Sequence, residues 1–171
     1  MKGDFMVVRD AHEQDFLNLS ALAIQVWLHT YATDGVRDAI SGFVLSEFTP
    51  EVFRRIHESA SQHILVAIHD GHLVGFVTVD LVSRCGVEGI EGFEVKTLYV
   101  QEHFHGKGIG TTLLDEASRR YGESLWLTTW VKNTPAIGFY EAYGLTRVGT
   151  AYFHLEGEAH ENVVLAKRGG L

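Results

Sequence analysis

Several residue types whose abundance marks particular protein classes are scarce in this chain of 171 residues. It has a single cysteine, Cys85, which excludes an intrachain disulfide framework and fits a reducing compartment. No apolar run approaches the roughly 18 residues that a membrane-spanning helix needs. The opening stretch, MKGDFMVVRDAHEQD, also lacks the apolar segment of a secretory signal. The expected location is therefore the cytoplasm, with no membrane partner.

Basic residues are in the minority as well, with 14 lysines and arginines against 22 aspartates and glutamates. The formal net charge of −8 argues against non-specific binding of nucleic acid. It fits a cationic substrate, although many proteins carry such a charge for solubility alone. The chain shows no repeat, low-complexity tract or linker. We therefore expect residues 1–171 to form one domain, long enough to bury about two-thirds of its unfolded surface.

What the sequence does contain is an ordered series of strand and helix patterns. Strands are expected at residues 6–9, 93–100, 124–131, 145–155 and 161–167, with two more inside 63–82 that meet at Asp70-Gly71. Helices are expected at 15–31, 34–48, 50–60, 110–121 and 134–144. Asp10 with Glu13 reads as a capping box, and Thr134 with Pro135 as the N-cap and first residue of the last helix. The series predicts an α/β (α+β) fold with a mixed central sheet of about seven strands flanked by helices.

Three glycines at alternate positions, Gly106, Gly108 and Gly110, stand where the strand at 93–100 gives way to a helix. Free backbone N–H groups and the helix dipole make such a turn a generic anion site. A P-loop is excluded because Thr111, and not lysine, follows Gly110. The dinucleotide fingerprint fails too, because it needs a glycine at position 111. From these residues alone, an anion site and a tightly packed helix start are equally open.

Two motifs in the correct order resemble one known family. The stretch H-G-K-G-I-G, residues 105–110, resembles the Q/R-x-x-G-x-G/A loop of the GCN5-related N-acetyltransferases (GNAT). The segment WLTTWVKNTPAIGFYEAYGLTRVG is similar to that family's strand, Asn, helix with Ala and Phe-Tyr, and closing Gly. Within the family, VWLHTY, the W…N…AI.FY…G block and the tail YFHLEGEAHENVVLAK look like the PaiA-type polyamine (spermidine/spermine) acetyltransferases. The resemblance implies the GNAT fold and acetyl-CoA as cosubstrate.

The same resemblance implies where coenzyme A binds. Backbone amides of the glycine loop would hold its pyrophosphate, and the preceding strand and an asparagine would bind its pantetheine arm. The implied cofactor-binding residues are Leu98, Tyr99, Val100, His105, Gly106, Lys107, Gly108, Ile109, Gly110, Thr111, Asn133 and Tyr140. His105 departs from the family, which usually has Gln or Arg there. Lys107 could equally be a solvated loop lysine, and Asn133 a turn residue.

Two side chains are candidates for catalysis. The resemblance makes Tyr140 the proton donor to the departing thiolate, against the alternative that it belongs to a core stripe with Phe139 and Tyr143. Glu94 is the candidate general base, because carboxylates on this strand often activate the amine in the family. Strand alternation would place Glu94 on one face with Lys96, Leu98 and Val100. It could equally be a surface partner of Lys96.

A metal ion and a covalent acyl-enzyme are not expected. The chain has ten histidines, but neither His69 with His72 nor His103 with His105 is joined by a cysteine or carboxylate at a recognised spacing. Cys85 lies in a glycine-rich stretch without a histidine signature nearby, so direct transfer in a ternary complex is favoured.

The sequence therefore predicts an acetyl-CoA-dependent N-acetyltransferase acting on a primary amine of a small cationic substrate such as a polyamine. Two alternatives stay open: an acetyltransferase for protein N-termini or lysines, and a non-catalytic sensor that binds acetyl-CoA. The expected partner is a small-molecule amine and not a nucleic acid, and a homodimer is compatible with the sequence.

Overall fold

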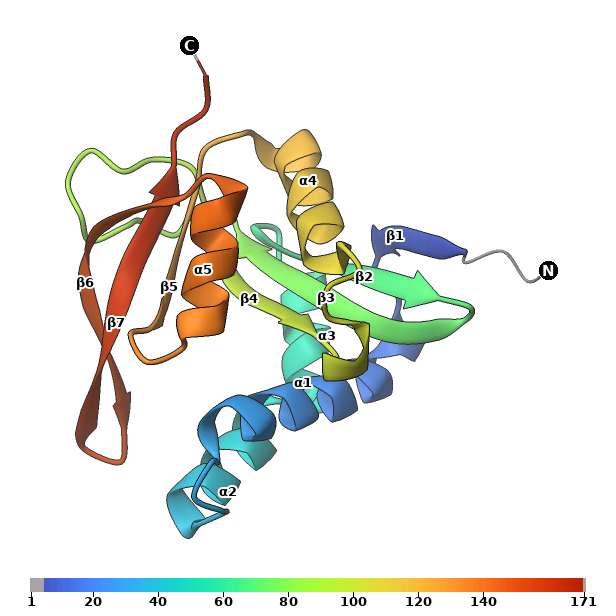
Figure 1. The fold of residues 1–171 in the computed structure, drawn as a ribbon. Coiled ribbons are helices and arrows are strands. Elements are labelled where there is room, and N and C mark those ends of the chain that lie inside the picture. The colour runs from blue at the N-terminus through green and yellow to red at the C-terminus, as the bar shows by residue number, and fades with distance from the viewer. Residues whose placement is uncertain (1–4, 171) are drawn as a thin grey trace.

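The computed structural model describes residues 5–170, and their secondary structure follows the predicted order (Figure 1). The elements are β1 (Met6–Asp10), α1 (Phe16–Tyr31), α2 (Asp38–Glu47), α3 (Pro50–Glu58), β2 (Gln62–His69), β3 (His72–Asp80), β4 (Phe93–Val100), α4 (Ile109–Tyr121), β5 (Leu125–Trp130), α5 (Thr134–Tyr143), β6 (Thr146–Leu155) and β7 (Glu158–Lys167). Short 3₁₀ turns, Glu13–Asp15 and Glu102–Phe104, precede α1 and α4. Among residues 5–170, no helix is both long and apolar enough to cross a bilayer.

The strands form one mixed sheet of seven in the order β1-β2-β3-β4-β5-β7-β6, which confirms the predicted fold class. Neighbouring strands are antiparallel except β4 and β5, which run parallel. A parallel pair needs a crossover connection, and α4 supplies it. The glycine loop at the start of α4 is therefore held at the end of β4.

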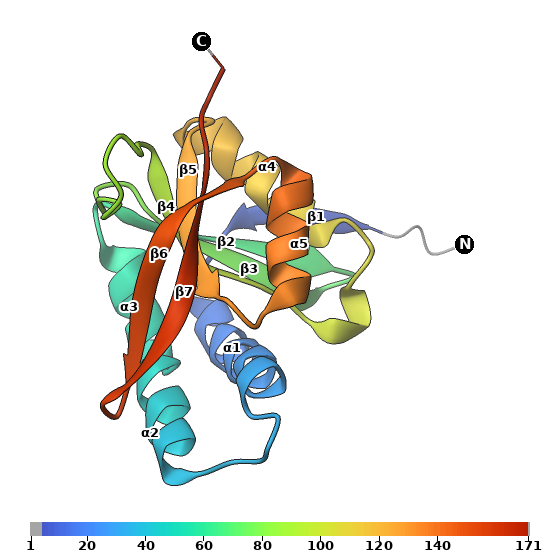
Figure 2. The ribbon, with the colours of Figure 1, turned by 60° about the vertical axis from the view of Figure 1, so that its left-hand side comes forward.

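Helices cover the two faces of this sheet unequally (Figures 1 and 2). One face packs against α4 and α5 in a large core that includes Leu113, Leu114 and Ile137. The other face packs against α1, α2 and α3 over β2, β3 and β4, around Leu19, Phe53 and Phe76. Over β5 and β7 that second face is covered by the long connection between β3 and β4.

The parallel pair β4 and β5 separates after two residues. Register is kept only at Phe93 with Leu125 and at Glu94 with Trp126. Beyond that point the strands diverge, as Figure 1 shows, and the edge of β4 that faces β5 has no strand partner. Unpaired N–H and C=O groups on such an edge are ready to bind an extended ligand.

A β-bulge in β4 overturns the predicted alternation of side chains. Thr78 pairs with Thr97, but the next residue, Val79, pairs with Val95, so Lys96 is the extra residue. Val95 and Leu98 both face the core under α4 and α5, three residues apart. Glu94 therefore points to the opposite face and does not share one with Leu98 and Val100, because a bulge shifts the period of two by one residue.

The start of the first helix also differs from the prediction. Asp10 is not its N-cap: it ends β1, and its carboxylate accepts a hydrogen bond from Arg120 at 2.7 Å. The chain instead turns at His12, whose N–H donates to the Asp15 carboxylate at 2.7 Å, and α1 begins at Phe16. The strand pairing of Asp10 with Leu65 outweighs its local preference for a cap.

Candidate active site

A cavity of about 570 Å³ occupies the space where β4 and β5 diverge. It is bounded by the end of α1, by β4, by the glycine loop and by the start of α5. Its volume is that of a ligand site for a small molecule or cofactor. Eleven of the twelve residues implied to bind coenzyme A line it: Leu98, Tyr99, Val100, His105, Gly106, Gly108, Ile109, Gly110, Thr111, Asn133 and Tyr140. Lys107 is the exception.

The glycine loop presents a run of unused backbone donors to this cavity. No described residue accepts a hydrogen bond from the N–H groups of residues 106–111, and the first helical bond of α4 runs from Thr112 to Gly108. Gly106 and Gly108 have φ of +75° and +77°, which favours glycine, and a Cβ on either would enter open space. A pyrophosphate fits this cradle of amides at a helix N-terminus.

Gly110 has a different purpose. A Cβ at this position would lie 3.0 Å from the Phe139 ring, so the missing side chain lets α4 and α5 approach closely. The two readings of the loop, anion site and tight packing, therefore apply to different glycines.

His105 fastens the loop to the strand before it. Its Nε2 donates to the carbonyl oxygen of Val100 at 2.8 Å, so that the residue where the family has Gln or Arg bridges β4 and the glycine loop. Lys107 points its Nζ over the ring of Phe104, 5.0 Å from the centroid. Its ammonium is therefore near the loop without lining the cavity.

Asn133 is the N-cap of α5, one residue earlier than predicted. Its side-chain oxygen accepts a hydrogen bond from the N–H of Ala136 at 3.4 Å, and Thr134 begins the helix. Because Asn133 also lines the cavity, its side-chain NH₂ remains available as a donor to a ligand. The turn and ligand interpretations are thus compatible in one residue.

The Tyr140 side chain, including its phenol ring, is buried. Tyr140 is 8% exposed, and burial, with a smaller contribution from Tyr31, raises its pKa well above the ordinary value. Burial likewise raises the pKa of Tyr99, with added contributions from Tyr31, Tyr140 and Glu47. Both phenols consequently stay protonated at neutral pH and can donate a hydrogen bond inside the cavity.

Tyr31 is a cavity residue to which the sequence assigned no role. It lies at the end of α1, and its ring packs between Trp27 and Trp130, with centroid distances of 4.8 and 5.5 Å. Burial raises its pKa. Val26 and Thr30 are the other α1 residues in the cavity wall. They lie one turn apart, and Thr30 directly precedes Tyr31, so helical spacing could have identified this face of α1.

Glu94 is not part of the cavity wall. Its carboxylate lies 4.0 Å from Lys96 Nζ, and its side chain is 16% exposed. It lies on the sheet face opposite α4 and α5, in register with Trp126 of β5. The structure therefore brings Tyr140 and the glycine loop together and leaves Glu94 outside that wall.

The sheet face opposite α5 is enclosed by segments far apart in the chain. The β6–β7 hairpin extends to α2 (Figure 2), where Phe153 meets Phe43 at a centroid distance of 5.5 Å. Arg37, just before α2, donates to Glu158 of the hairpin at 3.2 Å.

Among the described residues, no group of three His, Cys, Asp or Glu side chains could hold a metal ion. Cys85 does not line this cavity.

The fold and the site combine a glycine loop at the end of β4 with a cavity of about 570 Å³ between the diverging strands β4 and β5. The family model described as the acetyltransferase (GNAT) family matches residues 27–145, which is more than half of the chain. The protein therefore belongs to the GNAT family of N-acetyltransferases, which use acetyl-CoA as cosubstrate.

Individual relatives agree with this assignment. The chain is 23% identical over 160 residues to an uncharacterized N-acetyltransferase of Lactobacillus delbrueckii subsp. lactis, covering 91% of this chain and 92% of that one. It is 32% identical over 111 residues to the N-alpha-acetyltransferase RimI of Mycobacterium tuberculosis, covering 63% and 68%. Its fold is similar to the crystal structure of the PaiA N-acetyltransferase from Thermoplasma acidophilum in complex with coenzyme A, with a TM-score of 0.76, 20% identity and coverage of 96% and 99%.

Proposed function

We propose that this chain transfers the acetyl group of acetyl-CoA directly to the primary amine of a small cationic substrate, within one ternary complex. The observation that carries the proposal is that a single cavity joins the unused amides of the glycine loop, the free edge of β4 and the buried hydroxyl of Tyr140. A thioester held along β4 would have its phosphates at one end of this cavity and its reacting carbonyl near the other.

The roles of the binding residues follow from what each presents. N–H groups of residues 106–111 would hold the pyrophosphate, assisted by the nearby charge of Lys107. The unpaired edge of β4 around Leu98 to Val100 would bind the pantetheine arm and the acetyl carbonyl, and Asn133 would donate to the same arm. Bound acetyl-CoA supplies the activated acyl group.

Tyr140 would protonate the departing thiolate. A free thiol has a pKa of about 8.5, so the leaving group gains from a nearby donor at neutral pH. The raised pKa of Tyr140 keeps its proton in place until the thiolate forms. Glu94 would act as the base from the other face of β4. Because it does not line the cavity, it would accept the proton of the amine through a water molecule and not by direct contact.

A polyamine such as spermidine or spermine is the proposed acceptor. The net charge of −8 supports it, as does the similarity in fold to the PaiA N-acetyltransferase. No carboxylate lines the described cavity, so the distal ammonium groups would be held outside it. Glu47 is one candidate, because its charge contributes to the raised pKa of Tyr99, which lines the cavity. Glu158 is already paired with Arg37.

The experiment is a panel of amines assayed by release of free thiol from acetyl-CoA. Spermidine or spermine should have a higher kcat/KM than a neutral peptide N-terminus, and added salt should reduce the difference because it screens charge.

A preference for the peptide at low salt would replace the polyamine with the second candidate, a protein N-terminus or lysine. The 32% identity to RimI, itself an N-alpha-acetyltransferase, favours that candidate. Tight binding of acetyl-CoA with no turnover on any amine would identify a sensor.

Direct transfer has its own test in Cys85→Ala. Because Cys85 lies outside the cavity wall, the variant should keep nearly all activity. Intact-mass analysis of the wild-type enzyme with acetyl-CoA alone should show no acetyl adduct. A stoichiometric adduct on Cys85 would require a covalent mechanism instead.

A further inference from the structure

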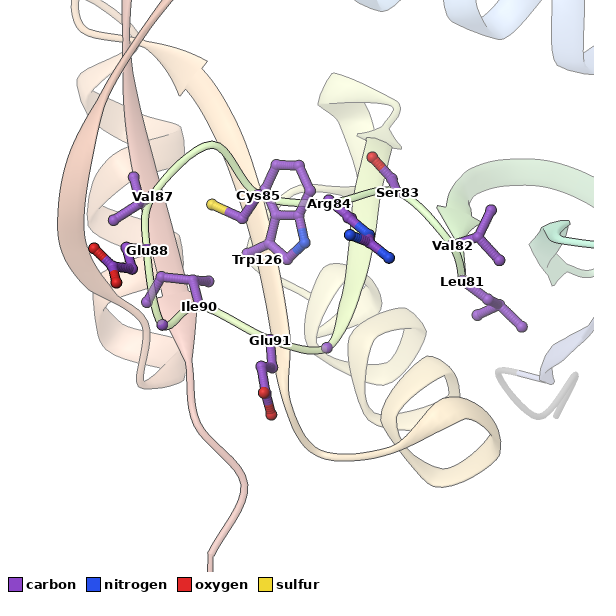
Figure 3. A pocket seen from close by; sticks show the side chains of 12 residues that line it. Leu81, Val82, Ser83, Arg84, Cys85, Val87, Glu88, Ile90, Glu91 and Trp126 are labelled. Atoms are coloured by element: carbon purple, nitrogen blue, oxygen red, sulfur yellow. The ribbon is translucent and has the colours of Figure 1, made fainter.

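A second cavity, of about 420 Å³, lies beneath the connection between β3 and β4 (Figure 3). It is lined by residues of the segment 81–92 and by Trp126 of β5, and it shares no lining residue with the acetyl-CoA cavity. It lies on the sheet face where the connection, and not a helix, covers β5 and β7. Nothing in the proposed acetyl transfer uses it.

Trp126 forms the floor of this cavity and has an unused donor. The residue is 6% exposed, and its indole Nε1 has no hydrogen-bond partner among the described residues. Buried polar groups are almost always paired, so an unpaired indole N–H needs an explanation. In Figure 3 the segment 81–92 passes around Trp126, and the indole nitrogen is on the side of Arg84.

The charged side chains around the cavity are arranged asymmetrically. Arg84 has no hydrogen bond or ion pair with any described residue, and its guanidinium lies on the same side of the indole as Nε1 in Figure 3. The carboxylates of Glu88 and Glu91 point away from the indole in that view. Two nitrogen donors, Trp126 Nε1 and the Arg84 guanidinium, therefore lie on one side of the indole, whereas the Glu88 and Glu91 carboxylates point away from it.

One part of the cavity wall is apolar. Cys85, Val87 and Ile90 pack with Trp126 into a small core against β6 and β7. A Cβ on Gly149 of β6 would lie 2.5 Å from a methyl carbon of Val87. Because glycine has no Cβ, the segment 81–92 can pack closely on the sheet. The cavity thus has a defined apolar side next to its donors.

We propose that this second cavity binds a small organic carboxylate, with the carboxylate between the Arg84 guanidinium and the Trp126 N–H and the apolar part against Cys85, Val87 and Ile90. A planar guanidinium matches a carboxylate with two parallel hydrogen bonds. The indole N–H supplies a third donor from the floor. The proposal does not depend on the acceptor of the acetyl group.

The first test is a titration with butyrate that is monitored through the indole ¹H–¹⁵N resonance of Trp126. The variant Trp126→Phe, which lacks this resonance, assigns it. The resonance should shift saturably with butyrate and not with the neutral analogue butyramide. Arg84→Gln should weaken binding at least tenfold without changing acetyl transfer, whereas Arg55→Gln, an exposed arginine on α3, should not. An unchanged resonance throughout the millimolar range, or the same response in Arg84→Gln, would overturn the proposal.

The second test uses Cys85, the only cysteine in the chain, as a reporter within the cavity wall. Iodoacetate and iodoacetamide both alkylate a thiol: the sulfur–carbon bond forms, iodide leaves and the thiol proton goes to solvent. The ratio of the two rates, iodoacetate over iodoacetamide, should be several times higher in the folded protein than in the urea-unfolded chain, and Arg84→Gln should abolish the difference. The net charge of −8 alone would lower this ratio on folding. A folded ratio equal to or below the unfolded ratio would contradict a carboxylate site.

Discussion

The two halves of the candidate active site are built from different materials. The coenzyme half consists mainly of backbone: six consecutive amides of the glycine loop and the free edge of β4. In the proposed function the amine approaches from the side of α1, whose side chains line the cavity, near the contact of α2 with the β6–β7 hairpin; these segments are far apart in sequence. A site made of backbone restricts the residue types that the chain can use, whereas a site made of side chains leaves no such pattern. The two halves therefore differ in how much the sequence reveals.

The variant Tyr140→Phe tests the point where the two halves meet, and we expect the largest effect there. It keeps the ring in its buried position and removes only the hydroxyl. Loss of a general acid should reduce kcat by about 10²-fold or more with little change in the KM for acetyl-CoA. Steady-state kinetics with the best amine of the panel, under conditions where chemistry is rate-limiting, measures it.

Tyr143→Phe is the matched control on the same helix. The Tyr143 hydroxyl donates to Asp115 at 2.7 Å on the outside of α5, and its pKa is raised to about 12 by burial and by that carboxylate. Tyr143 does not line the cavity, so kcat should stay near the wild-type value. If Tyr140→Phe kept more than about half of the wild-type kcat, Tyr140 would be a core residue, and the thiolate would be protonated by substrate or water.

The variant Gly108→Ala tests the backbone half. At φ of +77° an alanine is strained by about 1–2 kcal/mol, and its methyl group would enter the space beside the amides. We expect the KM for acetyl-CoA to rise about tenfold, with kcat at saturation mostly retained. Isothermal titration with coenzyme A should show the same loss of affinity.

Gly71→Ala separates strain from binding. Gly71 has φ of +81° in the β2–β3 turn, and a Cβ there also meets nothing within 4 Å. Both variants should melt at a lower temperature, but only Gly108→Ala should lose affinity for the coenzyme. Equal affinities in the two variants would mean that the loop amides do not hold the pyrophosphate.

The same division explains what the sequence could predict. Element order and the seven-stranded mixed sheet followed from periodicity and turn residues, whereas the residues proposed to bind the coenzyme came from the resemblance to the GNAT family. The bulge at Lys96 could not be predicted, since it depends on how β4 pairs with β3, and it moved Glu94 to the other face. Asp10 was misread as a cap because its strand pairing is a long-range contact. Tyr31 was given no role because its neighbours Trp130 and Tyr140 come from other elements.

The variant His105→Ala tests how the backbone half is fastened to the strand, with a smaller expected effect. It removes the hydrogen bond from Nε2 to the Val100 carbonyl, and a neutral hydrogen bond contributes about 0.5–1.5 kcal/mol. The KM for acetyl-CoA should therefore rise a few-fold. His105→Gln, which restores a side-chain N–H, should recover most of the affinity. Equal losses in both variants would show that the imidazole itself, and not this bond, contributes to binding.

The smallest effect on the protein is expected from Glu116, which lies on α4 beyond the helix start where the glycine loop is. Glu116 accepts hydrogen bonds from Arg119 and Arg120, and these hold its pKa at about 2. A carboxylate whose pKa is lower in the folded state stabilises the fold fully above its unfolded value of about 4.5, and this stability is lost as the pH falls toward 2. Glu116→Gln should therefore lower the unfolding free energy by less than about 1 kcal/mol at pH 7, because the pairs are partly exposed. Urea titrations of both proteins at several pH values should show curves that converge as the pH decreases below 4.5. The KM for acetyl-CoA should not change, and a rise in KM would mean that the coenzyme half depends on side chains beyond the loop that forms it.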